Sequence, residues 1–185
     1  MKFALTAAGA LLVVAGAANA DAITYRFTGE ANGSLGNATF TDAFFEILVT
    51  GDDADIFSPA PGLIRFETMS ATVSIEGVAN DVLINPTISV VSNQNSDVLV
   101  LGRVDTDRAL IVYNEPEFED YDLSAPFGPV TDETPGATAQ FRDLPTVAGA
   151  LDLSDMEFAV FEAIPAPGAM GLLALGGLVA TRRRR

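Results

Sequence analysis

Carboxylates are the most numerous side chains in this sequence that could carry out chemistry. The chain has 185 residues with 25 Asp and Glu, but it has no Cys and no His, and its one lysine is Lys2. The absence of Cys and His excludes Ser-His-Asp and Cys-His catalysis and zinc sites built on imidazole or thiolate. Because no lysine follows Lys2, Schiff-base and Ser-Lys mechanisms are excluded from the rest of the chain. No glycine-rich phosphate-binding motif is present either, so nucleotide chemistry has no support in the sequence.

Two acidic loops carry the hard oxygen ligands that Ca²⁺ prefers, with carboxylates at positions i and i+2 of a turn. The acids are Asp52, Asp53 and Asp55 in the first loop and Asp105 and Asp107 in the second. Neither loop matches an EF-hand, because Ile56 stands where that pattern needs a further ligand. Asp also ends strands and stays solvated in turns, which is the competing interpretation. We expect no cofactor other than Ca²⁺ bound by these loops.

A pair of carboxylates could also hydrolyse a glycosidic bond. With 25 acids in the chain, some pair will lie close together in almost any fold, so a pair alone indicates little. Sugar clefts commonly use aromatic platforms, yet the chain has no Trp and only three tyrosines, Tyr25, Tyr113 and Tyr121. We therefore expect a protein that is not an enzyme, with a secreted carboxylate-based hydrolase of glycosidase type as the alternative.

Short runs of alternating apolar and polar residues at roughly ten-residue spacing are typical of β-strands. The expected strands are 22–30, 38–50, 63–66, 71–77, 82–85, 87–91, 97–103, 108–113, 138–144 and 156–163. An acidic stretch with prolines, residues 114–135, predicts a long loop with short edge pieces. The pattern predicts an all-β fold with a single β-sandwich or jelly-roll-like domain that would position any site.

Two finer expectations concern the first and last strands. Glycines at positions 29, 33 and 36 predict turns soon after the first strand. In the last strand, alternation predicts that Met156, Phe158, Val160 and Ile164 share one face and that Phe161 faces elsewhere.

The first 20 residues have the pattern of a signal peptide. Lys2 supplies the positive start and an apolar run from Ala4 to Ala17 follows, interrupted only by Thr6. Ala18 and Ala20 fit the small-x-small pattern that signal peptidase cleaves, which would leave Asp21 as the new N-terminus. This run is short for a permanent membrane span.

The C-terminal segment is apolar and ends in cations. The 19 residues from Ala163 to Thr181 carry no charge, and as a full helix they would measure about 28 Å, close to the hydrocarbon core of a bilayer. Pro165 and Pro167 precede the expected hydrophobic helix, which runs from Gly168 to Ala180. The cations that follow are Arg182, Arg183, Arg184 and Arg185. Such a cluster holds its end of a span on the cytoplasmic side and places the body outside.

A short proline motif, a brief apolar helix and a closing arginine cluster together resemble the PEP-CTERM sorting signal. The motif here reads Pro165-Ala166-Pro167, with Ala166 where the family usually has Glu. The resemblance covers residues 164–185 and implies transient insertion in the inner membrane and cleavage by an exosortase-type enzyme near the motif. It further implies release from a Gram-negative-type bacterium or coupling to extracellular polysaccharide. A permanent anchor is the alternative.

The body between these segments is strongly acidic. Residues 21–163 contain all 25 acids, five Arg and no Lys, a net charge of −20. Such a surface repels DNA, RNA and anionic lipid, so nucleic acid is not an expected partner. The sequence thus predicts a signal peptide (1–20), an acidic β-sandwich domain (21–163) and a sorting segment (164–185). The expected function is that of an exported surface or extracellular-matrix protein of structural or binding type.

Overall fold

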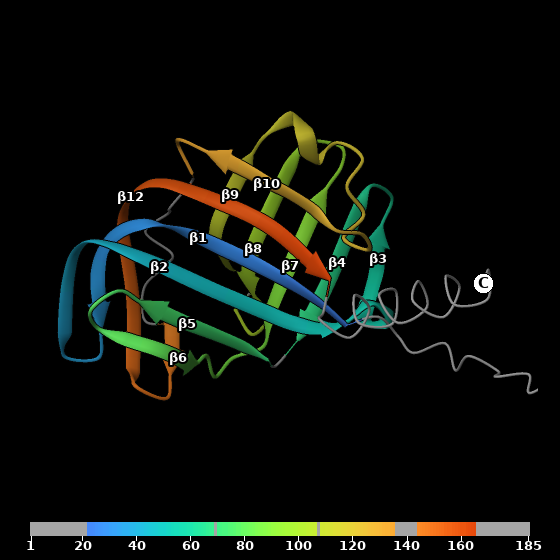
Figure 1. Cartoon of the computed structure of the whole chain (residues 1–185). Helices are drawn as coiled ribbons and strands as arrows, with labels where there is room; N and C mark the ends of the chain where they lie inside the picture. Colours follow the sequence, from blue (N-terminus) through green and yellow to red (C-terminus); the bar gives the residue numbers. More distant parts are fainter. Residues whose placement is uncertain (1–21, 69, 107, 136–143, 166–185) are drawn as a thin grey trace, which may run out of the picture.

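The computed structural model describes residues 22–68, 70–106, 108–135 and 144–165. These residues form two antiparallel β-sheets, and apart from two short 3₁₀ turns no helix occurs among them (Figure 1). The predicted all-β fold is therefore confirmed, although twelve strands replace the ten expected. The strand expected at 138–144 lies outside the described residues except for Leu144, and both predicted terminal helices lie outside them as well.

The first sheet has seven strands in the order β10-β12-β1-β2-β5-β6, with β11 paired to β12. Their bounds are β1 Ala22–Leu35, β2 Ala38–Asp52, β5 Ala71–Ile75, β6 Ala79–Leu83, β10 Phe127–Asp132, β11 Leu144–Thr146 and β12 Gly149–Pro165. The second sheet has five strands in the order β3-β4-β7-β8-β9. Their bounds are β3 Ile56–Ala60, β4 Leu63–Thr68, β7 Ile88–Asn93, β8 Val98–Arg103 and β9 Arg108–Asn114. The 3₁₀ turns are η1 Asp53–Asp55 and η2 Pro116–Phe118.

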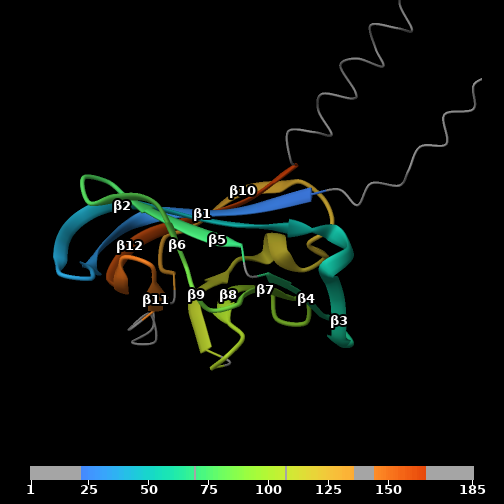
Figure 2. The same ribbon diagram turned by 90° about the horizontal axis from the view of Figure 1, so that it is seen from below.

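The two sheets face each other and enclose one apolar core, a sandwich-like arrangement that is visible from below (Figure 2). Aromatic pairs join the sheets across this core. The Tyr25 ring on β1 lies 5.0 Å from the Phe66 ring on β4, and the Phe27 ring on β1 lies 6.1 Å from Tyr113 on β9. All four side chains are fully buried. Burying large aromatic rings supplies much of the hydrophobic stabilisation of a fold without disulfides.

Strand β1 is longer than the sequence predicted, because two of the three expected glycine turns are not turns. Gly29 and Gly33 lie inside β1, and a Cβ at either position would collide with a backbone carbonyl of β12. The glycines therefore allow close approach of two strands, and only Gly36, in the left-handed conformation with φ of 58°, turns the chain. A register shift at Ala31 bends the strand.

Strand β12 is also longer than the predicted strand 156–163. Ala159, Phe161 and Ala163 are buried, whereas Phe158 and Val160 point to the outer side and are half-buried. Phe161 thus faces away from Phe158 and Val160, as the sequence predicts, and its face is the one that the core covers. Both faces of the strand carry large apolar residues, so alternation alone could not identify the buried one.

The acidic stretch after β9 forms the predicted long loop, and β10 is its edge piece. Its carboxylates at Glu117, Glu119 and Asp120 are exposed, but Phe118 and Tyr121 between them are buried in the core. The loop thus closes one end of the sandwich with aromatic side chains and leaves its charges in solvent.

All three tyrosines are buried and donate their hydroxyl protons to backbone carbonyls. The acceptors are Leu123 O for Tyr25 (2.9 Å), Val160 O for Tyr113 (3.5 Å) and Ala125 O for Tyr121 (3.2 Å). Burial raises the pKa of each phenol, and nearby acids raise it further. The folded state therefore favours the neutral form of each phenol.

We expect this burial to make the protein sensitive to alkali. Unfolded tyrosines ionise near pH 10, so the tyrosine contribution to stability is complete below that pH and is lost as the pH rises above it. The free energy of unfolding should fall by about 1.4 kcal/mol per pH unit for each phenol that only the unfolded chain ionises. Absorbance at 295 nm should show no phenolate near pH 10 and then all three phenolates together with unfolding. Independent ionisation of the three tyrosines near pH 10 in the folded protein would contradict their burial.

Candidate functional site

Most residues of the predicted sorting and cleavage sites lie outside the described part of the chain. These are Ala18, Ala20, Asp21, Ala166, Pro167, Arg182, Arg183, Arg184 and Arg185, and Asp107 is outside it too. Pro165, the first residue of the sorting motif, is described. It ends β12 and lies opposite Ile23 of β1 in the antiparallel register.

The first acidic loop forms the 3₁₀ turn η1 between β2 and β3. Asp52 caps this turn, since its Oδ1 accepts a hydrogen bond of 2.8 Å from the backbone N–H of Ala54. Asp53 and Asp55 occupy its first turn. Within the described ranges, no group of three or more acidic side chains is placed to hold a metal ion. Calcium binding by this loop stays a prediction without geometric support.

Asp105, from the second acidic loop, faces an arginine. Its Oδ1 and Oδ2 accept hydrogen bonds from Nε (3.1 Å) and Nη2 (2.8 Å) of Arg103. This bidentate pair holds the pKa of Asp105 below its usual range. A guanidinium at this distance competes with any cation for both carboxylate oxygens.

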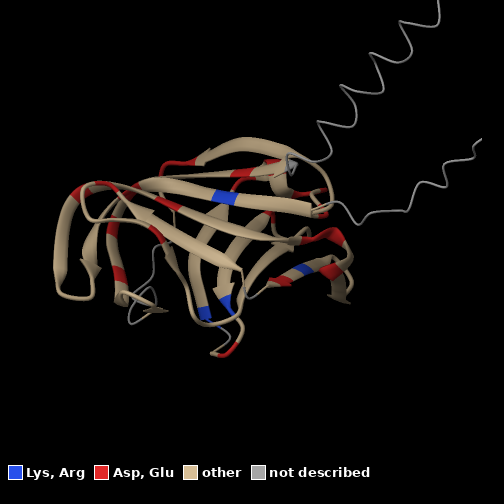
Figure 3. Ribbon diagram, turned by 60° about the horizontal axis from the view of Figure 1, so that its bottom comes forward, with Lys and Arg blue, Asp and Glu red and all other residues tan. Residues whose placement is uncertain are grey.

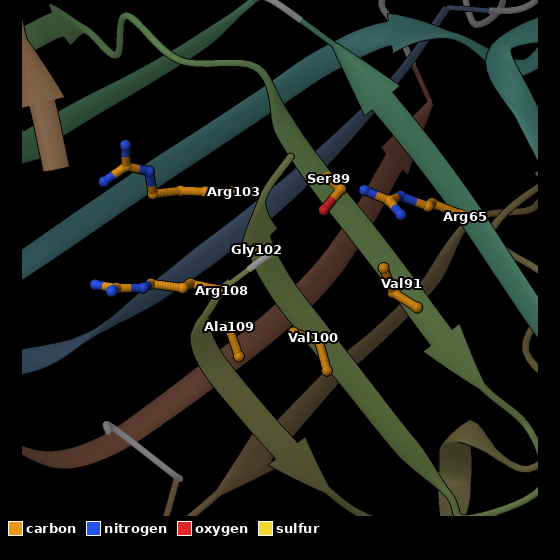
Figure 4. A pocket seen from close by; sticks show the side chains of 8 residues that line it. All are labelled: Arg65, Ser89, Val91, Val100, Gly102, Arg103, Arg108 and Ala109. Carbon is orange, nitrogen blue, oxygen red and sulfur yellow. The ribbon is translucent and has the colours of Figure 1, made fainter. Parts of the chain in front are cut away.

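A shallow hollow of about 190 Å³ lies on the outer face of the second sheet (Figure 4). We call it the arginine groove. Its lining residues are Arg65, Ser89, Val91, Val100, Gly102, Arg103, Arg108 and Ala109. The arginine side chains come from three strands, β4, β8 and β9. Three of the five arginines of a body that carries 25 acids therefore line it, with Arg65 on one side and the side chains of Arg103 and Arg108 extending toward the other (Figure 4).

A second hollow, of about 400 Å³, lies at β10 and β12 on the first sheet. Thr131, Glu133, Glu157 and Phe158 line it. The two glutamates are the carboxylates that the described structure offers to the alternative hydrolase.

Sequence reasoning missed both hollows. Arg103 and Arg108 flank a tight turn, so a hairpin would have placed them opposite each other, as the register does. Arg65 joins them only through the pairing of β4 with β7 and of β7 with β8, and nothing in the local sequence fixes that order.

No family model, no curated protein and no solved structure matches this chain. The described part of the chain contains no helix that is both long and apolar enough to cross a membrane.

Proposed function

We propose that this protein is an exported bacterial surface or extracellular-matrix protein with a structural or binding role. In this proposal signal peptidase removes residues 1–20, and residues 21–163 form a β-sandwich or jelly-roll-like body. Residues 164–185 insert in the inner membrane as a PEP-CTERM-like tail until an exosortase-type enzyme cleaves near Pro165-Ala166-Pro167. The body is then released or coupled to extracellular polysaccharide.

The arrangement of the two ends of the body is the observation that carries this proposal. The first residues of β1 and the last residues of β12 are neighbours in one sheet, with Ile23 opposite Pro165 and Thr24 opposite Ile164 (Figure 1). The first and last residues of the described body therefore lie at the same end. The N-terminal segment can then direct export, and the C-terminal segment can insert in the membrane, without either one having to pass around the folded body.

The charge distribution supports display in water rather than attachment to lipid or nucleic acid. Acidic segments are spread over the whole body, and basic ones are few (Figure 3). Arg26, at the centre of the first sheet, pairs with Glu46 on β2 (2.7 Å) and with Glu162 on β12 (3.4 Å). With a net charge of −20 the body repels its own copies and anionic lipid headgroups.

The alternative hydrolase has one specific observation in its favour, the pair Glu133 and Glu157 in a common hollow. Two carboxylates across a sugar bond are sufficient for glycoside hydrolysis. A hydrolysis screen with glycans would support this alternative only if Glu157→Gln abolished the activity. We favour the binding role because the lining of this hollow includes a single aromatic ring.

Removal of the tail should change where the protein is found. A variant that stops after Pro165 keeps every pair between β1 and β12, so it should fold as the full chain does. In a bacterial host without the processing enzyme, we expect the full chain in the membrane fraction and the truncated variant in the soluble exported fraction.

A second variant without residues 1–20 is the control and should stay in the cytoplasm. Recovery of the full chain in the soluble fraction would contradict the role proposed for the tail. Membrane retention of the full chain in its native host, without cleavage, would favour the permanent anchor.

A further inference from the structure

We propose that the arginine groove binds the carboxylate of a uronic-acid unit in an anionic polysaccharide. This inference rests on the proposed binding role of the body but does not depend on the sorting tail. It assigns a ligand class to a site that sequence reasoning did not find.

The three arginines lie on strands β4, β8 and β9 of the second sheet. Arg103 and Arg108 are directly opposite each other on β8 and β9, and Arg65 reaches from β4 toward Ser89 on β7 (Figure 4). Like charges directly opposite each other in a sheet are unfavourable unless an anion lies between or beside them. Asp105 supplies one such anion to Arg103. Arg108 is exposed and makes no ion pair with the residues that the structure describes.

Arg65 is held in place and keeps donors for a ligand. Glu67 Oε1 lies 2.8 Å from its Nε, but the N–H does not point at that oxygen, and Nε is buried without a hydrogen-bond partner. The two terminal nitrogens make no hydrogen bond to any described residue. A planar guanidinium with free terminal N–H groups binds a carboxylate through two parallel hydrogen bonds.

The floor of the groove fits the ring of a sugar. Ser89, Gly102 and Ala109 are consecutive partners across β7, β8 and β9, and their small side chains create the hollow. Val91 and Val100 form the next row and offer apolar contact to the C–H face of a ring. A hollow of about 190 Å³ is smaller than pockets for drug-sized ligands, so it suits one sugar unit.

An exposed aromatic ring continues the groove toward the sheet edge. Phe57 on the edge strand β3 is 44% exposed and lies opposite Arg65 in the register, which in turn lies opposite Val91. Neighbouring strands are about 4.8 Å apart, so this ring is close enough to stack on the adjacent unit of the same chain. The row of an aromatic ring, a guanidinium and valines favours a polymer that carries both carboxylates and apolar ring faces.

The charge of the whole body affects how this binding must be measured. At low ionic strength a body with net charge −20 repels a polyanion, whereas at 0.15 M salt the repulsion is screened beyond about 8 Å. The contacts inside the groove are shorter than that distance. We therefore expect affinity to rise between low salt and 0.15 M salt.

The test is calorimetric or fluorescence titration of the full chain, purified in non-ionic detergent, with an oligosaccharide of uronic acid at 0.15 M NaCl. Arg65→Gln should raise the Kd about tenfold, and Arg108→Gln, whose side chain extends away from Arg65 (Figure 4), should raise it less. Arg26→Gln is the matched control. It removes the same charge from the outer face of the other sheet and should leave the Kd within about twofold.

Three results would overturn the proposal. They are no binding of the uronate oligosaccharide, equal binding of a neutral oligosaccharide of the same length, and equal losses in the Arg65→Gln and Arg26→Gln variants. Sodium sulfate should compete only weakly, and competition as strong as that of free uronate would replace the sugar assignment with a general anion site. The membrane fractionation described above is independent of these results, so failure of one proposal can be distinguished from failure of the other.

Discussion

Replacement of Phe161 by Ala should lower the free energy of unfolding by about 3–5 kcal/mol. This side chain is fully buried at the centre of the core and contacts rings from both sheets and from the loop after β9. The ring partners are Tyr25, Phe27, Tyr113, Phe118, Tyr121 and Phe127, with centroids 5.2–6.4 Å away. Truncation to Ala leaves a cavity that the six surrounding rings cannot fill.

Chemical denaturation followed by tyrosine fluorescence measures this effect, and Phe44→Ala is the matched control. Phe44 lies on β2 of the same sheet but is 41% exposed, so its truncation should cost less than about 1 kcal/mol. A domain is stable by only about 5–15 kcal/mol, so Phe161→Ala is close to the limit of folding, and Phe161→Leu provides a milder step. Equal losses for Phe161→Ala and Phe44→Ala would show that β12 does not bury the face described here.

Replacement of Asp132 by Ala should lower the free energy of unfolding by about 1–3 kcal/mol. Asp132 ends β10 and is only 3% exposed. Its carboxylate accepts hydrogen bonds from the backbone N–H groups of Asn114 (3.1 Å) and Thr134 (2.8 Å). Since Asn114 ends β9, this one side chain ties the edges of the two sheets together.

Two variants separate this tie from a simple effect of charge. Asp132→Asn keeps an acceptor oxygen and should lose less stability than Asp132→Ala. Asp120→Ala removes the same charge from an exposed position in the adjoining loop and should change the stability little. If Asp120→Ala and Asp132→Ala had the same effect on the denaturation midpoint, the hydrogen bonds of Asp132 would not stabilise the fold.

Local patterns in the sequence were sufficient to predict the strands in which apolar residues on one face alternate with polar residues on the other. In the expected strand 71–77, Ala71, Val73 and Ile75 alternate with polar residues, and all three are buried. The expected strands 97–103 and 108–113 likewise correspond to β8 and β9, which a short turn joins. Such signals depend only on residues close in the chain.

Features that depend on distant pairing could not be predicted. The length of β1 depends on carbonyls of β12 that approach Gly29 and Gly33, more than 100 residues away in sequence. The buried face of β12 depends on which side the second sheet covers, and the arginine groove depends on the order of β4, β7 and β8. The interpretation of the two terminal segments, in contrast, rests on composition and short motifs alone, because these residues lie outside the described fold.

The intact mass of the protein recovered from its native host tests the export and sorting proposal most directly. We expect a chain that begins at Asp21 and ends within Pro165-Ala166-Pro167, with or without added mass from coupled polysaccharide. Such a product would retain β1 and β12 as paired strands. A mass that corresponds to Met1 through Arg185 would show that neither end is processed and would contradict the proposal.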